Sequence, residues 1–252
     1  MFADFVIAPR SLQVSAHAKS KKYGDADPEL TYTVGGDGLI EGDVADVKLV
    51  TTSNGHAGRW QVQISDVQVS SDYVVSDLVF ADFVVAPRGL VVSAAAKSKK
   101  YGDVDPDLTY TVGGDGLVNG DELTGVLAHT SNGHSGNWKI TQGSLMASSD
   151  YEITSFNDAD FTVNKRPITV VAAAKSKKYG DADPDLTYTV GGDGLVGTDT
   201  LSGALAHTSN GHAGTWSINQ GNLGNADYDV FFLGATYVVN LRPITVVVAA
   251  KS

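Results

Sequence analysis

The residue types that could do chemistry in this chain are acidic side chains and histidines that recur in short clusters. Clustered carboxylates are what Ca²⁺ requires. The pattern is not an EF-hand loop, because that loop needs a glycine and a distal glutamate in order and Pro106 interrupts the first cluster. We therefore expect solvated turn acids and no cofactor, with a turn calcium site as the alternative. The candidate calcium ligands are Asp103, Asp105, Asp107, Asp181, Asp183 and Asp185.

Two histidine pairs, His129 with His134 and His207 with His212, have the five-residue spacing of a conceivable metal site. Imidazole is the commonest transition-metal ligand. However, the related earlier segment has no histidine at the position equivalent to His129, and no third ligand is spaced nearby. We expect no metal here. The histidines that follow Asn-Gly pairs, including His56, are expected to cap or flank a turn.

Catalytic and phosphate-binding patterns are missing from the sequence. The chain has no Gly-x-Ser-x-Gly nucleophile motif. Its Gly-Gly-Asp-Gly loops at 35–38, 113–116 and 191–194 are not followed by the Gly-Lys-Ser/Thr of a phosphate cradle. The sequence therefore predicts a protein that is not an enzyme.

Composition excludes several further classes of protein. The 252 residues carry a net charge of −11 and contain no cysteine. The negative charge disfavours nucleic acid and anionic lipid as partners, since both require a positive surface. Disulfides and thiolate metal sites are impossible without cysteine. No apolar run approaches the roughly 20 residues of a membrane helix, so we expect no membrane insertion.

Internal repetition dominates the chain. The sequence Lys-Tyr-Gly-Asp recurs with its tyrosine at Tyr23, Tyr101 and Tyr179, a spacing of 78 residues each time. The ends repeat the tail and the head of the same unit, so we expect a fragment of a longer array and an added start residue at Met1. The absence of a signal peptide then carries no information about secretion. The predicted boundaries are 1–10 for the tail of a preceding repeat, 11–87, 88–165 and 166–242 for three repeats, and 243–252 for the first strand of a following one.

Alternation of apolar and polar residues predicts about six short strands in each repeat. The Asn-Gly pairs at 54–55, 132–133 and 210–211 predict hairpins with type I′ turns, in which both residues have positive φ. We expect the tryptophan to be the centre of each small core, and Trp138→Ala to cost roughly 3–5 kcal/mol. The predicted core residues are Trp60, Trp138, Trp216, Tyr23, Tyr101 and Tyr179.

The junctions between repeats are only two or three residues long and contain proline, which fixes φ near −65°. We therefore expect neighbouring repeats to be held at a restricted angle. The predicted junction residues are Pro87, Arg88, Arg166, Pro167, Arg242 and Pro243. The nearby basic group of Lys97, Lys99 and Lys100 favours a protected strand edge, with docking of an acidic glycan or of a neighbouring repeat as the alternative.

These blocks resemble the MBG ("mostly beta-grasp", Tyr-Gly type) repeat of very large bacterial surface adhesins. The resemblance is carried by residues 178–188 (KYGDADPDLTY), 200–205 (TLSGAL) and 214–218 (GTWSI), and it covers the whole chain in three registers. The first copy departs from the pattern after Gly42. The resemblance implies a mostly-β fold, with three tandem β-grasp-like modules in an elongated end-to-end array, and it supplies no catalytic residues.

The function that we expect is a structural stalk of a secreted or cell-surface adhesin, which projects a distal binding domain. Its partners within the chain are neighbouring repeats, and a glycan or host surface protein would be bound through other domains. The alternative is a weak glycan- or protein-binding module that acts by avidity, which an exposed aromatic platform at Tyr101, Tyr110 or Trp138 would reveal. A third possibility is a filament assembled through unpaired edge strands.

Overall fold

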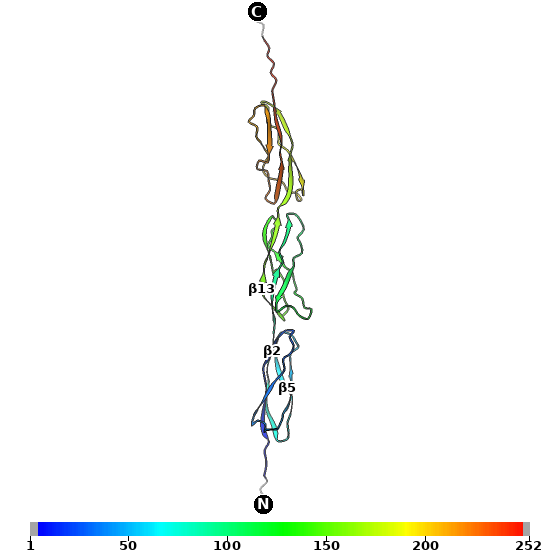
Figure 1. Cartoon of the computed structure of the whole chain (residues 1–252), viewed down its shortest axis with the longest axis vertical. Helices are drawn as coiled ribbons and strands as arrows, with labels where there is room; N and C mark the ends of the chain where they lie inside the picture. Colours follow the sequence, from blue (N-terminus) through cyan, green and yellow to red (C-terminus); the bar gives the residue numbers. More distant parts are fainter. Residues whose placement is uncertain (1–4, 249–252) are drawn as a thin grey trace. The chain divides into compact units, whose positions relative to one another are not determined.

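Strands, turns and loops make up the whole described chain, and none of its residues is helical (Figure 1). The computed structural model describes residues 5–248. The predicted mostly-β class and the three tandem modules are confirmed. The parts of the predicted flanking repeats that fall on residues 1–4 and 249–252 lie outside the described residues.

The backbone contacts divide the chain into two compact units. Unit 1 comprises Met1–Ala95, Thr109–Ala128 and Thr141–Asp158. Unit 2 comprises Ala96–Leu108, His129–Ile140 and Ala159–Ser252. Unit 1 therefore contains the first repeat together with part of the second, and unit 2 contains the remainder of the second repeat together with the third.

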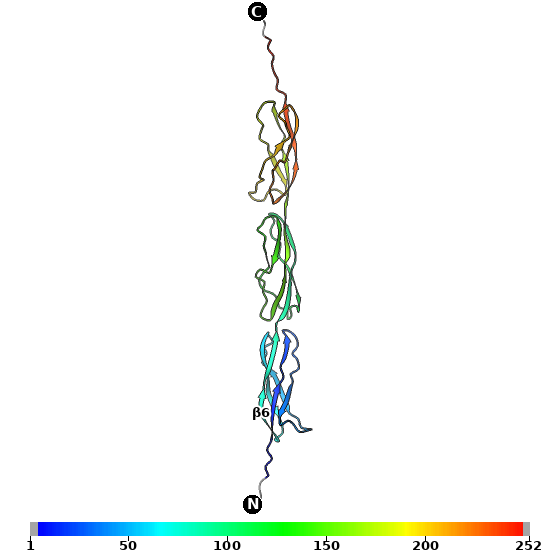
Figure 2. The same ribbon diagram turned by 90° about the vertical axis from the view of Figure 1, so that its left-hand side faces the viewer.

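The first repeat consists of two sheets within unit 1. In the three-stranded sheet, of order β3-β1-β6, the central strand pairs antiparallel with β3 and parallel with β6. Figure 2 labels β6 in the first repeat. The four-stranded sheet has the order β2-β7-β5-β4. The strands are β1 (Arg10–Ala16), β2 (Lys19–Lys22), β3 (Tyr32–Gly36), β4 (Asp46–Thr51), β5 (Gly58–Gln68), β6 (Tyr73–Val79) and β7 (Ala81–Ala86).

The second repeat has sheets of the same order. Its three-stranded sheet, β10-β8-β13, belongs to unit 1, and most of its four-stranded sheet, β11-β12-β14-β9, belongs to unit 2. The strands are β8 (Arg88–Ala94), β9 (Lys97–Lys100), β10 (Tyr110–Gly114), β11 (Ala128–His129), β12 (Gly136–Thr141), β13 (Tyr151–Asn157) and β14 (Ala159–Asn164).

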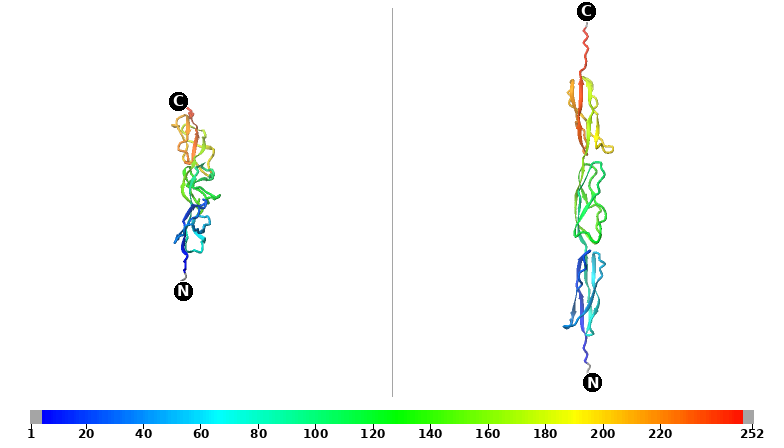
Figure 3. Two further views of the ribbon diagram at one scale, coloured as in Figure 1. Left: turned by 60° about the horizontal axis from the view of Figure 1, so that its bottom comes forward. Right: turned by 45° about the vertical axis from the view of Figure 1, so that its right-hand side comes forward.

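The third repeat lies entirely in unit 2 and follows the same plan, with sheets β17-β15-β20 and β16-β21-β19-β18 (Figure 3, yellow to red). Its core joins the two sheets, because Ala172 of β15 packs with Ile218 of β19 and Tyr237 of β21. The strands are β15 (Arg166–Ala172), β16 (Lys175–Lys178), β17 (Tyr188–Gly192), β18 (Ala206–His207), β19 (Gly214–Asn219), β20 (Tyr228–Leu233) and β21 (Ala235–Asn240).

The prediction that tryptophan is the centre of each core is wrong. Trp60, Trp138 and Trp216 are half-buried, and each indole Nε1 donates to the carbonyl of the histidine four residues earlier. The aromatic side chain directly opposite each tryptophan in the sheet is fully buried instead, as Phe83 is opposite Trp60. The tryptophan ring has a single polar group, its indole N–H. The ring is therefore more stable at the edge of a core, where this N–H reaches a hydrogen-bond acceptor.

The Asn-Gly pairs do connect two antiparallel strands, but the predicted turn type is wrong. In the first repeat only Gly55 has positive φ (90°), while Asn54 does not. The loop from 52 to 57 is longer than a two-residue turn, and the Asn54 side-chain oxygen accepts a hydrogen bond from the backbone N–H of His56 (3.1 Å). This Asx-type turn replaces the tight hairpin that the dipeptide favours.

The lysine-rich segments form real strands, a feature that their polarity concealed. β2, β9 and β16 each run parallel to the last strand of their own repeat, at the edge of the four-stranded sheet. Lysine on an edge strand discourages pairing with another chain, in agreement with the protected-edge interpretation.

Replacing Phe83 should destabilise the protein more than replacing Trp60. We expect Phe83→Ala to cost about 3–5 kcal/mol, because a fully buried ring leaves a cavity. Trp60→Ala should cost less, about 1–3 kcal/mol, since its ring is partly solvated already. Urea denaturation followed by circular dichroism would measure both values. A larger loss for the tryptophan variant would restore tryptophan as the centre of the core.

Candidate functional site: the repeat junctions

The chain passes from one repeat to the next through a single residue. Pro87 alone separates β7 from β8, and Lys165 alone separates β14 from β15, whereas Pro167 lies inside β15. The junction segments are held by backbone hydrogen bonds, from Tyr23 N to Ala86 O at 2.9 Å and from Tyr101 N to Asn164 O at 2.8 Å. The connection leaves little slack, and the surfaces around it contact one another.

A buried carboxylate on each later repeat receives two hydrogen bonds from the repeat before it. Asp150 accepts from His56 Nδ1 (2.7 Å) and from the backbone N–H of Ala57 (2.7 Å). Asp227 accepts in the same way from His134 Nδ1 (2.7 Å) and from Ser135 N–H (2.7 Å). Both aspartates are buried, so these bonds replace the water that the carboxylate loses.

The tyrosine of the Tyr-Gly motif fills the space beside this carboxylate. Tyr23 stacks on His56 (6.0 Å between ring centroids) and meets Tyr151 of the next repeat edge-on (5.4 Å). Tyr101 repeats the arrangement with His134 (6.1 Å) and with Tyr228 (5.5 Å). Edge-on aromatic pairs contribute about 0.5–1.5 kcal/mol beyond the buried area.

This tyrosine is less exposed in the two repeats that are followed by another repeat within residues 5–248. Tyr23 is 9% exposed and Tyr101 is half-buried, whereas Tyr179 of the third repeat is 47% exposed. Tyr101 and Tyr179 therefore do not belong to the inner core of their own repeats, contrary to the prediction. Tyr101 packs instead against the core of the third repeat.

Cations from both sides complete each junction. At the first one, Arg88 Nη1 donates to Tyr23 O (3.1 Å) and to Asp25 (2.8 Å), and Lys22 Nζ binds Asp115 (2.7 Å). At the second, Arg166 binds Asp103 (3.0 Å), and Lys100 binds Asp193 (2.6 Å). Arg242 of the third repeat contacts Asp181 (2.6 Å), while Pro243 is exposed.

The glycine of the Tyr-Gly motif is required by close approach as well as by backbone conformation. A Cβ placed on Gly102 (φ +83°) would lie 2.3 Å from Cγ2 of Val196 in the next repeat. The third copy of this glycine, Gly180, has nearly the same φ (+86°), but the nearest atom to its Cβ is an Arg242 nitrogen at 3.6 Å. Of these two glycines, a methyl group would therefore clash with a neighbouring side chain only at Gly102, where the next repeat is docked.

Three of the junction acids, Asp115, Asp193 and Asp227, have a lowered pKa. Lys22 and the backbone N–H of Gly89 hold the pKa of Asp115 below its usual value, and Lys100 does the same to the pKa of Asp193. Burial alone would raise the pKa of Asp227, but the hydrogen bonds from His134 and Ser135 outweigh it and lower the pKa. A hydrogen bond to Asp199, with burial, raises the pKa of Tyr101 to about 12.

Four of the six candidate calcium ligands are paired with an arginine or a lysine. Asp105 binds Lys99 (2.6 Å) and His129 (3.2 Å), and Asp103 binds Arg166. Asp183 binds Lys177 (2.6 Å), which together with the Tyr237 hydroxyl and His207 lowers its pKa to about 2. Asp107 and Asp185 are exposed. Within residues 5–248, no three histidine or acidic side chains gather as a metal site would require.

The two histidines of each predicted pair have separate roles. His129 stacks on the buried ring of Phe161 and His207 on that of Tyr237, each at 4.3 Å between centroids. His134 instead belongs to the junction, as His56 does. The spacing of five residues therefore places the two rings of a pair in different surroundings.

The sequence did not lead us to the acidic residues that bind side chains of the preceding repeat. The Gly-Gly-Asp-Gly loops, considered only as phosphate cradles, supply Asp115 and Asp193 to the lysines described above. An Asp-Tyr pair at 150–151 and 227–228 supplies the buried carboxylate and the edge-on ring. The recurrence of Asp-Tyr in every copy was the signal available.

The comparison with known families agrees with this architecture. The family model of the MBG domain (YGX type) matches residues 12–82, 90–162 and 168–238. The chain belongs to this family, whose members are non-catalytic structural repeat modules typical of extracellular surface proteins. No curated protein matches the chain. No helix in the described part is long and apolar enough to cross a membrane.

Acid should weaken the junction through its carboxylates. A lowered folded-state pKa means that the stabilisation is complete above the unfolded value of about 3.9 and is lost as the pH falls through the folded value. Asp227→Asn should therefore cost about 1.5–3 kcal/mol at pH 7 and flatten the dependence of Tm on pH between about 5 and 2. Calorimetry across this range measures both effects. Asp229→Asn, which changes the same charge at an exposed position, is the control, and an equal effect of the two variants would contradict a special role for Asp227.

Calcium should leave the stability unchanged. Because Asp103, Asp105 and Asp183 are already paired with Arg or Lys, we expect the same Tm with millimolar Ca²⁺ and with a chelator. A Tm that rises with the calcium concentration, and that loses this rise in Asp105→Asn, would show that the acids form a calcium site after all.

Proposed function

We propose that the chain is a segment of structural spacer repeats from a large bacterial extracellular adhesin, where the repeats form a stalk that projects a distal binding domain. The observation that carries the proposal is the junction itself. The same tyrosine, histidine, glycine, lysine and arginine contacts occur twice, each time around a connection of one residue. A spacer needs each repeat to be fixed on the next, and these contacts support that role.

The surface chemistry fits a spacer exposed to the outside of a cell. The net charge of −11 favours solubility and discourages non-specific association. The absence of cysteine removes any dependence on redox conditions. The partners of each repeat are, on this proposal, its neighbours in the chain, and a glycan or host protein is bound by other domains.

The avidity alternative receives less support. An array of equal binding sites would need the same open aromatic platform in every copy. Tyr101, Tyr110 and Trp138 are all half-buried. Phe80 and Phe231 are exposed, but they do not stand at equivalent positions of their repeats. Two near-equivalent junctions also favour a structural role over catalysis, which requires one asymmetric pocket.

A methyl group at Gly102 should loosen the second junction without unfolding either repeat. Gly102→Ala places Cβ against Val196, whereas Gly180→Ala imposes the same unfavourable φ with open space around it. We expect both variants to lose about 1–2 kcal/mol through backbone strain. Only Gly102→Ala should broaden the pair-distance distribution in small-angle X-ray scattering.

The control separates strain from docking. If Gly180→Ala changes the scattering as much as Gly102→Ala does, the effect comes from the turn and not from the junction. Scattering from the unmodified protein that already indicates freely jointed repeats would overturn the spacer proposal, because undocked repeats cannot hold a distal domain at a distance.

A further inference from the structure

The first two strands and the last two strands of a repeat form two long segments that run side by side. In the third repeat, β15 continues into β16 after two residues, and β20 continues into β21 after one. β15 pairs parallel with β20, starting where Arg166 lies opposite Tyr228. β16 pairs parallel with β21, ending where Lys178 lies opposite Asn240. The residue offset is the same in both sheets, so the two segments form one continuous parallel pair.

A force that pulls on the chain enters and leaves the repeat at opposite ends of this pair. The third repeat is entered through Lys165, at the N-terminal end of β15, and is left after Asn240, at the C-terminal end of β21. The two segments are therefore pulled in opposite directions along their own length. Under this shear the hydrogen bonds of the ladder share the load and must break together. A force across the strands would break the same bonds one after another, and each contributes little alone.

Both strands that receive the load are central strands of their sheets. β15 lies between β17 and β20, and β21 lies between β16 and β19. In the first repeat, β1 lies between β3 and β6, and β7 lies between β2 and β5. Detaching a loaded strand therefore requires the loss of two ladders rather than one.

Further backbone hydrogen bonds extend the pairing at both ends. The N–H of Arg166 donates to the carbonyl of Asp227 at 2.9 Å, just before β20 begins. The N–H of Tyr179 donates to the carbonyl of Asn240 at 2.9 Å, just after β16 ends. The points where the load enters and leaves the repeat are therefore themselves hydrogen-bonded.

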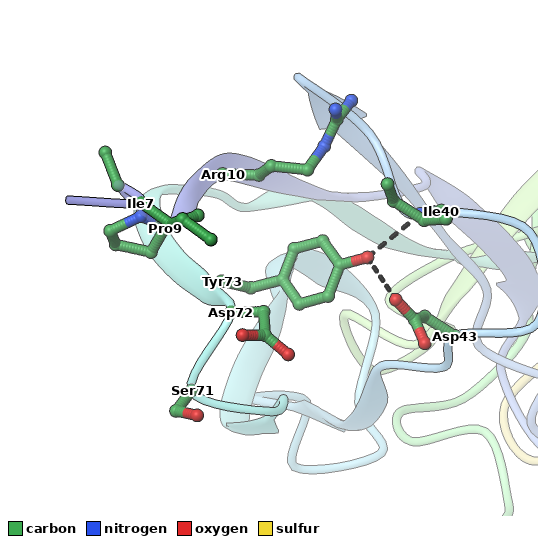
Figure 4. Close-up of a pocket in the computed structure, with 9 residues that line it drawn as sticks. Ile7, Pro9, Arg10, Ile40, Asp43, Ser71, Asp72 and Tyr73 are labelled. Atoms are coloured by element: carbon green, nitrogen blue, oxygen red, sulfur yellow. Dashed lines mark hydrogen bonds between the residues drawn. The ribbon is translucent and has the colours of Figure 1, made fainter. Parts of the chain in front are cut away.

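The N-terminal ends of the two segments can be followed in the first repeat (Figure 4). Arg10 begins β1 and Tyr73 begins β6, and the two residues lie opposite one another in the ladder. The Tyr73 hydroxyl accepts from the Ile40 backbone N–H at 2.9 Å and donates to Asp43. Tyr228 makes the equivalent two bonds in the third repeat. A buried tyrosine thus fixes the start of the second segment to a loop of the same repeat.

The paired segments of the third repeat are shielded from water by the core. Ile168 and Val170 of β15, and Tyr237 and Val239 of β21, are at most 2% exposed. A backbone hydrogen bond beside such an apolar layer is stronger than one in water, and its partners find no water to replace it as it breaks. Shielding therefore raises the barrier to separating the segments.

We propose that each repeat is a load-bearing clamp, in which the parallel pairing of its first and last segments keeps the repeat folded while the chain is pulled. The clamp lies within one repeat and is a property of its fold. It does not rest on the proposed spacer role, because scattering tests the docking of neighbouring repeats whereas pulling tests the resistance of a single repeat.

The third repeat has the most regular clamp of the three. The pairing of β1 with β6 shifts by one residue between Leu12 and Gln13, and the pairing of β8 with β13 skips Thr154. The pairing of β15 with β20 is uninterrupted. A bulge leaves one residue unpaired and disrupts the ladder locally, so we expect the third repeat to resist the load longest.

The test pulls the third repeat of the whole chain in two directions. The chain has no cysteine, so two introduced thiols define where the handles of an optical trap attach. Lys165→Cys/Leu241→Cys loads the clamp in shear, whereas Lys165→Cys/Asp229→Cys pulls β15 and β20 apart from the same end. All three positions are exposed. At equal constant force, we expect the repeat to unfold at least about tenfold more slowly in shear, because the unfolding barrier governs forced unfolding.

Two controls separate the clamp from general stability. Urea denaturation followed by circular dichroism should give the same free energy of unfolding for both cysteine variants, so the direction of the force is the only difference between them. Insertion of one threonine between Val230 and Phe231 recreates the extra residue of the second repeat, which folds with it. The insertion should accelerate unfolding severalfold in shear and much less in the other direction. Equal unfolding rates in the two directions would overturn the proposal, as would an insertion that accelerates both equally.

Discussion

Each junction depends on one buried carboxylate that the following repeat cannot satisfy by itself. Asp150 and Asp227 are shielded from water, and their hydrogen bonds from a histidine and a backbone N–H come from the repeat before. Removing one of these donors while the repeats stay docked would leave an uncompensated buried charge, which is strongly unfavourable. The burial is a property of the junction, since the equivalent residue of the first repeat, Asp72, is exposed to water.

The repeated motifs acquire a physical meaning from this arrangement. The Tyr-Gly turn and the Asn-Gly-His loop form one end of a repeat, whereas the Gly-Gly-Asp-Gly loop and the Asp-Tyr pair form the other. Gly114 of that loop has φ +76°, and a Cβ there would lie 2.6 Å from Gly89 O, so glycine fixes the position of Asp115 beside it. The compact units also cross the sequence repeats, because unit 1 joins the first repeat to the sheet β10-β8-β13.

The sequence reveals the local structure far better than the junction. Alternation identifies strands such as β8 and β15, since side chains of period two face one buried layer. The bond between His56 and Asp150 spans 94 residues, and no local pattern indicates it. The tryptophan prediction failed for a related reason, because residue size does not show which of two opposite rings is buried. Edge strand β2 was concealed because its stability comes from parallel pairing with β7, far along the chain.

Weak contacts are sufficient to dock neighbouring repeats, because the covalent connection gives the two surfaces a high effective concentration. A connection of one residue holds the end of each repeat next to the repeat that follows, so a few charged hydrogen bonds and one aromatic pair keep the junction closed. The same faces on separate molecules meet only at their bulk concentration and carry like net charge, which opposes encounter. Near-identical repeats can therefore be firmly docked within a chain while separate copies stay apart in dilute solution. Much stronger junction contacts would fix neighbouring repeats no better, but they would drive the separate chains to aggregate.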